Sequence, residues 1–418
     1  MALTITTRTD SLARRVCRRE HSLFQDDLAA CRDRLDIKDR SFLVVGGAGT
    51  IGAATILQLL RFEPSRVVIL DTSENNLAEL ARTIRSGAHP FAGELEFAPL
   101  DYGSSLAANY LAASPPIDVV MTFAALKHVR SERDLFSCLA LLDVNVLRAD
   151  RFLAAMRRLG HGKHGVFFVS TDKAAYPASV MGATKRLMES VLWSHASAAP
   201  PGTLRYDSLP PLPKVSSVRF ANVAYSDGSL PWAFLQRVEK GQPLGAPQGV
   251  RRYFVTAEEA GQLCLLAARI CPHRHVLVPR LSPSLHTSTF REIAELTLEA
   301  LGYEPSWYNR EDDARRALTT DLSRGRYPVV LTQADTSGEK AMEVFIGRGE
   351  KAVPLEFDMV SAVEGIASSA GELDRFLDWA KDALETSVPS KEQLVEQLAT
   401  VVPGLKHKET GTSLDERI

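Results

Sequence analysis

The sequence of 418 residues predicts an α/β protein with a doubly wound parallel sheet and a smaller, mixed domain in its C-terminal half. Three observations lead to this fold class. Short apolar runs alternate with helical patterns through the first half of the chain. A glycine-rich turn follows the first of these runs. The second half loses the regular alternation, which indicates a region with another role.

The apolar runs of the first half predict strands that are buried on both faces. Residues 41–45 form a short, mostly apolar stretch that ends in glycines, as parallel strands covered by helices do. Five later runs have the same character, at 66–71, 95–98, 117–123, 165–170 and 215–220. Helical patterns lie between them, at 50–61, 73–86, 132–159 and 179–196.

The second half predicts a less regular arrangement. Thr289 and Glu292 have the spacing of a capping box that opens a helix over 290–301, and Gly302 marks its end. The other expected elements are helices at 229–241 and 257–271, a strand at 274–278, and closing helices at 358–385 and 390–400.

The N-terminal segment is basic but does not have the pattern of a signal peptide. Its four arginines (14, 15, 18 and 19) are followed by acidic residues, and no hydrophobic stretch is present. A partial apolar stripe over 11–35 predicts one or two helices, which dock on the main domain or contact a second subunit. The expected organisation is a helical extension (1–40), a dinucleotide-binding domain (41–225), a partly interleaved substrate region (226–403) and a flexible tail (404–418).

Composition excludes several classes of function. The net charge of −2 gives no indication of nucleic-acid binding, and no apolar run approaches the ~20 residues that a membrane span needs. The five cysteines lack Cys-x-x-Cys spacing and the histidines lack metal spacing, so no metal is expected. Scattered single cysteines fit a reducing, cytoplasmic location.

The glycine-rich turn predicts a Rossmann-type dinucleotide site. In the run from Gly46 to Gly52, Gly46 permits the tight turn, Gly49 lets the backbone approach the pyrophosphate, and Gly52 allows close packing of helix and strand. The helix that opens at Thr50 and Ile51 presents its positive end to the phosphates.

Two carboxylates extend this prediction. Asp71 ends the second strand, where it can bind the ribose 2′-hydroxyl, and this favours NAD over NADP because a 2′-phosphate would meet a negative charge. Asp101 follows the third strand. It is a candidate for the adenine edge, or simply a turn residue at the strand end.

A polar loop after the fifth strand is the candidate for chemistry. Thr171, Asp172 and Lys173 follow the strand directly, and Lys185 comes twelve residues after Lys173. Folds of this type normally use Tyr-x-x-x-Lys as the acid/base pair for hydride transfer at an alcohol carbon. Here Met181 stands where the tyrosine is expected, so a phenol cannot take the proton. The loop supplies a carboxylate and an amine instead.

These motifs together resemble a known family. The Gly-x-x-Gly-x-x-Gly spacing and the chain length resemble extended short-chain dehydrogenase/reductases. Over about 41–265 the chain resembles the capsular polysaccharide family of UDP-N-acetylglucosamine 4,6-dehydratases. Methionine at the tyrosine position occurs in a branch whose members usually carry an N-terminal membrane region, which this chain lacks. The segments that carry this likeness are 123–129, 144–146, 170–177, 180–186, 218–223, 228–229 and 251–260.

The C-terminal half departs from the family pattern. The substrate domain of the family usually carries Arg-Pro-Gly-Glu-Lys-Leu. In this chain only Gly338, Glu339 and Lys340 stand in that place, with Glu343 after them. The stretch 275–290 also matches poorly. These departures concern the identity of the sugar and nucleotide more than the cofactor.

The resemblance implies roles for the catalytic loop. A 4,6-dehydratase moves a hydride from C4 of the sugar to NAD, eliminates water across C5 and C6, and returns the hydride to C6. Asp172 would be the acid for the C6 hydroxyl, Lys173 the base at C5, and Lys185 a partner of the nicotinamide ribose. The C4 hydroxyl proton would pass to Thr171, to Asp172 or to a water, with Tyr176 as a weaker alternative.

The resemblance also implies binding residues and partners. Ala124 joins the cofactor site, and Lys127 and His128 at the same sheet edge are candidates for the substrate diphosphate or cofactor. Asn222, Arg252 and Lys340 are candidates for nucleotide-sugar binding, since arginine can bind a diphosphate in a bidentate manner. A homo-oligomer is expected. The alternatives are a nucleotide-sugar epimerase or ketoreductase, and a non-catalytic NAD-binding scaffold.

Overall fold

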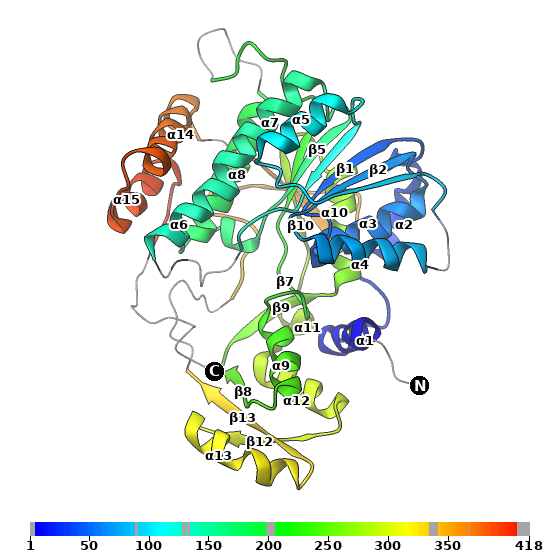
Figure 1. Cartoon of the computed structure of the whole chain (residues 1–418), viewed down its shortest axis with the longest axis vertical. Coiled ribbons are helices and arrows are strands. Elements are labelled where there is room, and N and C mark those ends of the chain that lie inside the picture. The colour runs from blue at the N-terminus through cyan, green and yellow to red at the C-terminus, as the bar shows by residue number, and fades with distance from the viewer. Residues whose placement is uncertain are drawn as a thin grey trace.

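A nine-stranded sheet forms the centre of the protein (Figure 1). The computed structural model describes residues 5–87, 91–127, 132, 134–197, 205–333, 342–366 and 368–407. The strand order is β14-β15-β10-β6-β5-β4-β1-β2-β3. The bounds are β1 Ser41–Val45, β2 Arg66–Leu70, β3 Glu94–Ala98, β4 Val119–Thr122, β5 Gly165–Val169, β6 Val215–Val218, β10 His275–Pro279, β14 Ala352–Val353 and β15 Val360–Glu364.

Strand pairing confirms the doubly wound α/β class. All pairs from β10 to β3 are parallel, and only β15 and β14 are antiparallel additions at one edge. The chain runs outward from β1 through β2 to β3, then returns to place β4 on the other side of β1. This reversal creates a switch point between β1 and β4, where ligands bind in such sheets.

Helices cover both faces of the sheet with separate apolar cores. One core joins the sheet to α5, α6, α7, α8, α14 and α15, and the other joins it to α2, α3, α4 and α10. In Figure 1, α14 and α15 lie outside α6 and α8. The bounds are α2 Gln25–Ala30, α3 Thr50–Leu59, α4 Glu74–Arg85, α5 Ser105–Ala113, α6 Leu135–Leu142, α7 Arg148–Leu159, α8 Val180–His195, α10 Ala257–Arg269, α14 Ala370–Glu385 and α15 Lys391–Val401.

The first-half predictions are confirmed to within a few residues at the element ends. Where one helix was expected over 132–159, a π-helical segment, Asp143–Leu147, separates α6 from α7. The helix predicted over 358–385 is wrong in its first part. Residues Val360–Glu364 form strand β15, which is mostly buried and pairs in antiparallel fashion with β10. The helix begins only at Ala370.

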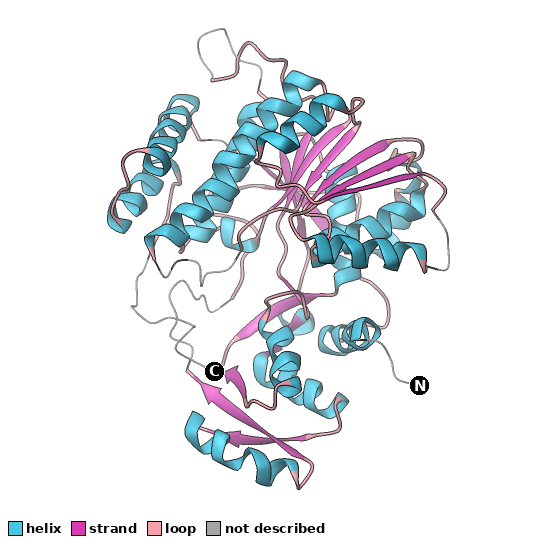
Figure 2. Ribbon diagram, viewed as in Figure 1, coloured by secondary structure: helices cyan, strands magenta, loops and turns pink. Residues whose placement is uncertain are grey.

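Two small sheets and a third core make up the lower part of Figure 2. The capping box of Thr289 and Glu292 is confirmed: the Thr289 hydroxyl accepts from Glu292 N at 3.1 Å, and Glu292 Oε2 accepts from Thr289 N at 2.7 Å. The sequence analysis predicted none of the strands here, because glycine, proline and charged residues interrupt their apolar character, as at Leu244–Pro247 and Glu304–Tyr308. The bounds are β7 Asn222–Val223, β8 Leu244–Pro247, β9 Arg251–Val255, β11 Thr287–Thr289, β12 Glu304–Tyr308, β13 Arg326–Thr332, α9 Leu230–Glu239, α11 Pro283–His286, α12 Phe290–Ala300 and α13 Glu311–Leu322.

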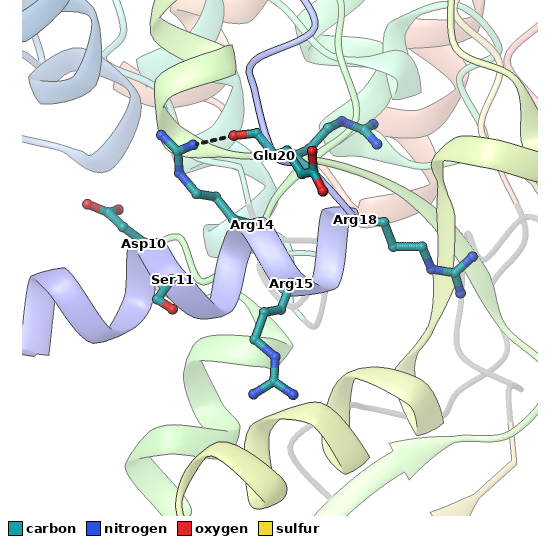
Figure 3. A pocket seen from close by; sticks show the side chains of 7 residues that line it. Asp10, Ser11, Arg14, Arg15, Arg18 and Glu20 are labelled. Atoms are coloured by element: carbon teal, nitrogen blue, oxygen red, sulfur yellow. Dashed lines mark hydrogen bonds between the residues drawn. The ribbon is translucent and has the colours of Figure 1, made fainter.

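The N-terminal helix α1, Ile5–Cys17, is docked on this lower part. Leu12 and Val16 are buried in the third core. The neighbouring arginines form ion pairs with glutamates of α10 and α12, at 2.7 Å for Arg14 and Glu258 and 2.9 Å for Arg15 and Glu299. A shallow hollow of about 690 Å³ lies along this helix (Figure 3). Residues between 10 and 20 line it, and none of the predicted site residues is among them. Through these ion pairs, Arg14 and Arg15 contribute to the attachment of α1 to the rest of the chain.

The described residues contain neither a helix that could span a membrane nor a cluster that could bind a metal. None of their helices combines the length and apolar character that crossing a membrane requires. Nor do three or more of their His, Cys, Asp or Glu side chains gather in a way that could hold a metal ion.

The contact between α10 and α3 gives a stability prediction. A Cβ built on Gly261 of α10 would lie 2.7 Å from the Ala54 carbonyl oxygen of α3. Gly261→Ala is therefore expected to lower the free energy of unfolding by about 1–3 kcal/mol, measured by urea denaturation. The control is Gly371→Ala in α14, where the nearest atom is Arg375 Nη1 at 3.6 Å. There alanine should be neutral or stabilise by up to ~1 kcal/mol. Equal effects at both positions would contradict the packing argument.

Candidate active site

The glycine turn between β1 and α3 has the shape that the sequence predicted. Gly46 has a φ of +71°, and a Cβ there would lie 2.5 Å from Ala124 N, at the end of the neighbouring strand β4. A Cβ on Gly52 would collide with the Gly46 carbonyl oxygen. These two glycines are therefore required by the packing of the turn itself. Ala124 contacts the turn directly, at the switch point of the sheet.

Gly49 has a different reason to be glycine. A Cβ at this position would meet only Gly46 O, at an ordinary 3.6 Å. Packing therefore does not exclude a side chain. Gly49 is the N-cap of α3, and the amides of Thr50 and Ile51 follow it at the positive end of the helix. The absence of a side chain at Gly49 would let an anionic group approach this end of the helix.

Asp71 holds the glycine turn from the end of β2. Its Oδ2 accepts a hydrogen bond from Ala48 N at 3.0 Å, and its Oδ1 accepts one from Ser73 N at 2.9 Å. These bonds place the carboxylate beside the turn, where the sequence analysis expected it.

Asp101 is engaged within the protein. Its Oδ1 accepts from Gly103 N at 2.9 Å, and its Oδ2 pairs with the Arg148 guanidinium. Both contacts agree with the alternative of a turn residue at the strand end. Its role at the adenine edge stays a prediction.

The loop after β5 gathers the predicted acid and base. A 3₁₀ turn, Asp172–Ala174, begins directly after Thr171. Asp172 Oδ1 accepts a hydrogen bond from the Thr171 hydroxyl at 2.9 Å and one from Lys173 Nζ at 3.2 Å. The Asp172 side chain is 4% exposed and that of Lys173 is 35% exposed. The pair is thus partly enclosed at the C-terminal edge of the sheet, which differs from an ion pair on an open surface loop.

Lys185 and Met181 lie on the first two turns of α8. Lys185 is buried and donates from Nζ to the Val169 carbonyl at 2.7 Å, at the end of β5. Burial lowers its pKa to about 8, although the Glu189 carboxylate acts in the opposite direction. Met181 is 2% exposed and belongs to the apolar core beneath the helix. Its thioether cannot take up a proton at this position. Tyr176, the nearby phenol, is 40% exposed.

A buried ion cluster lies behind this loop, and sequence analysis missed it. The Arg219 guanidinium is fully buried and binds Glu189 at 2.6 Å and Glu350 at 2.6 Å. Glu189 also accepts from the Ser170 hydroxyl at 2.6 Å, next to the catalytic loop. Arg186 pairs with both carboxylates. The sequence feature that could have indicated this cluster is the charged residue Arg219 directly after the buried strand β6.

Three of the predicted substrate-side positions lie on the other wall of the site. Asn222 and Arg252, on β7 and β9, both contact the Glu343 carboxylate, at 2.7 Å and 3.4 Å. Lys127 donates from Nζ to the Asp227 carbonyl at 3.0 Å, and Asp227 N donates to the Thr50 hydroxyl at 3.1 Å. Lys127 is thereby held near the start of α3. His128 and Lys340 lie outside the described residues.

The sheet, the glycine turn and the covering helices define the fold as a Rossmann-type α/β fold. A solved structure with this fold, Pen from Bacillus thuringiensis, superposes with a TM-score of 0.60 at 19% identity. The alignment covers 79% of this chain and 88% of that one. At this identity the likeness concerns the fold alone.

Sequence comparison identifies the family. The chain belongs to the polysaccharide biosynthesis protein family (Polysacc_synt_2), which it matches over residues 42–364. The capsular polysaccharide biosynthesis protein CapD of Staphylococcus aureus is 28% identical over 254 residues, which cover 58% of this chain but only 38% of CapD. A UDP-glucose 4-epimerase of Rickettsia typhi is 26% identical over 270 residues, 63% of this chain and 72% of that protein. The expected polysaccharide biosynthesis family is confirmed. The narrower assignment to UDP-N-acetylglucosamine 4,6-dehydratases and the methionine branch stay predictions.

The ion cluster makes acid stability testable. Burial alone would raise the pKa of Glu350, but the hydrogen bond and charge of Arg219 lower it to about 2. This stabilisation is complete above the unfolded value of 4.5 and is lost as the pH falls towards 2. Glu350→Gln should reduce stability at pH 7 by about 3 kcal/mol and flatten its fall between pH 4.5 and 2, measured by denaturation at each pH.

An exposed glutamate provides the control for this variant. Glu79 pairs with Arg82 on the surface of α4, with side chains 71% and 73% exposed. Glu79→Gln should change stability by less than ~0.5 kcal/mol at any pH. A Glu350→Gln variant with the acid profile of the unmodified protein would contradict the assigned role of the cluster.

Proposed function

We propose that this protein is an NAD-dependent nucleotide-sugar 4,6-dehydratase that serves glycan or polysaccharide synthesis. The observation that carries the proposal is the Asp172–Lys173 pair, enclosed at the sheet edge with Thr171 hydrogen-bonded to the carboxylate. Elimination across C5 and C6 needs a base at C5 and an acid at the C6 hydroxyl. A 4-epimerase or ketoreductase reacts at C4 and does not need this second pair. The family match supports a role in polysaccharide synthesis.

The residues of the glycine turn fit a dinucleotide. A Cβ at Gly49 would lie in nearly open space at the start of α3, Asp71 lies beside the turn, and Lys185 lies at the end of β5. The start of α3 would hold the pyrophosphate, Asp71 the adenosine ribose, and Lys185 the nicotinamide ribose. NAD supplies a hydride acceptor at C4 of the sugar, and in its reduced form a hydride donor to C6.

The geometry supports one account of the C4 proton. Because Thr171 donates to Asp172 at 2.9 Å, its hydroxyl can pass the C4 hydroxyl proton to that carboxylate. Asp172 then carries the proton needed by the departing C6 hydroxyl, which leaves as water. The Lys173 amine would take the C5 proton during elimination, exchange it with solvent while it is an ammonium group, and deliver a solvent-derived proton to C5 as C6 is reduced. Over the whole cycle the water consists of the C6 hydroxyl and the former C4 hydroxyl proton, so the charges and atoms balance.

An epimerase is the second candidate, because a UDP-glucose 4-epimerase is among the relatives. The two reactions give products of different mass. The protein with NAD should convert UDP-N-acetylglucosamine or a related sugar to a product lighter by one water. In D2O this product should carry one solvent deuteron at C5, followed by mass spectrometry and NMR. A product of unchanged mass would support epimerisation instead, and NAD binding without turnover on a broad panel of sugars would support a non-catalytic scaffold.

Removal of the proposed base separates chemistry from cofactor binding. Lys173→Ala should abolish dehydration, because no amine is left to take the C5 proton, and should leave NAD affinity unchanged. The matched control is Lys38→Ala, since Lys38 is 71% exposed and pairs with Glu63 at the surface. Turnover is measured from product formation and NAD affinity by calorimetry. Dehydration by Lys173→Ala at the wild-type rate would rule out the assignment.

A further inference from the structure

Glu343 is a buried carboxylate that both small strands beside the site hold in place. Its Oε1 accepts a hydrogen bond from the Asn222 amide at 2.7 Å and faces Arg252 Nε at 3.4 Å. Its Oε2 accepts from Tyr253 N at 3.0 Å. The side chain is only 5% exposed. Both oxygens therefore act as acceptors, a pattern that a carboxylate satisfies and a carboxamide cannot.

The segment that follows Glu343 is fixed to the catalytic loop. The Phe345 carbonyl accepts from Arg219 Nη1 at 3.1 Å. A Cβ on Gly347 would lie 2.6 Å from the Ala175 carbonyl oxygen, just after the Asp172–Ala174 turn. Glu350 ends the segment in the buried ion cluster. Residues 343–350 thus span from the strands that carry Asn222 and Arg252 to the loop that carries Asp172 and Lys173.

Charged groups on both sides of the site shift the pKa of Glu343. Burial raises its pKa above the usual value, and the Asp172 carboxylate raises it further. The hydrogen bond from Tyr253 N and the charges of Arg252 and Lys173 lower it. Burial and the negative charge of Glu343 also raise the pKa of the Tyr253 phenol. Glu343 therefore lies within electrostatic range of the catalytic pair and in contact with Arg252.

We infer that Glu343 is a positioning residue that holds Arg252 and Asn222 ready to bind the diphosphate of the nucleotide sugar. The inference rests on the proposed function, which makes Arg252 a diphosphate ligand. A guanidinium binds a phosphate in two places only when its plane is fixed. The contact of Nε with Glu343 at 3.4 Å and the hydrogen bond from Nη1 to the Arg251 carbonyl at 2.9 Å together restrain that plane. Glu343 acts through Arg252 and does not itself touch the substrate.

A double-mutant cycle tests this dependence. UDP affinity is measured by calorimetry with NAD at saturation, in the wild type, Glu343→Gln, Arg252→Gln and the double variant. Glu343→Gln should weaken UDP binding about tenfold, the size expected when a hydrogen-bonded charged contact is lost. In the Arg252→Gln background the same change should have a much smaller further effect, limited to what acts through Asn222, because the guanidinium that Glu343 positions is gone. Kinetics should show a raised KM with kcat little changed.

Controls separate positioning from loss of structure. NAD affinity, measured below the Tm of each variant, should remain near wild type in Glu343→Gln, whose Tm should fall because a carboxamide cannot accept at both positions. Glu356→Gln, at a side chain 68% exposed, should match wild type throughout. If Glu343→Gln does not fold, Glu343→Asp replaces it, since it keeps the charge and shortens the reach to Asn222. Unchanged UDP affinity, or equal losses in both backgrounds, would overturn the inference alone. A wild-type protein that binds NAD but not UDP would overturn the proposed function, and the inference with it.

Discussion

The buried pairing of Arg219 with Glu189 and Glu350 is the constraint on which the site depends. Arg219 follows β6, Glu189 lies on α8, and Glu350 belongs to the C-terminal segment. A fully buried guanidinium is tolerated only when acceptors surround it, because the cost of removing its charge from water is several kcal/mol. Loss of any one partner would leave an unmatched charge in the interior. The three elements are therefore held at one fixed arrangement.

This arrangement determines where the chemical groups lie. Glu189 binds Ser170, which precedes Thr171 and Asp172, and one turn earlier on the same helix Lys185 reaches the end of β5. Glu350 and the Phe345 carbonyl bring the C-terminal segment against the loop. As a result the Asp172–Lys173 pair is enclosed from two sides. The same contacts extend to Glu343 and the strands that carry Asn222 and Arg252.

The methionine at position 181 has a structural explanation. The first turn of α8 packs into an apolar core with α6 and α7, and Met181 is part of that core. The Met181 side chain lies among apolar side chains of that core, although the Glu132 carboxylate accepts from Met181 N at 3.0 Å. A phenol at this position would need a polar partner within the core. The hydroxyl of Thr171 and the carboxylate of Asp172 are polar groups at the nearby sheet edge, and the proposed function assigns the proton chemistry to them.

Local patterns in the sequence were enough for the main sheet, the glycine turn, Asp71 and the loop at Thr171–Lys173. In these cases a few neighbouring residues carry the information: apolar runs for buried strands, glycines where backbone atoms meet, and polar residues at strand ends. The same reasoning failed at β15, where pairing with β10 overrode a helical pattern. It also predicted none of the strands of the two small sheets, because they lack the continuous apolar runs of the main sheet, as β8 and β12 with their prolines illustrate.

What the sequence determined by itself is the class of fold, the place of the glycine turn and the polar residue types at the strand ends. Only the tertiary structure decided which charges meet. Arg219 and Glu350 are 131 residues apart in the chain, and Asn222 and Glu343 are 121 apart. Such pairs leave no local periodicity, since each partner looks like an ordinary polar residue until folding buries both. Burial then makes their pairing obligatory, and this is the physical reason that the walls of the site became visible only in three dimensions.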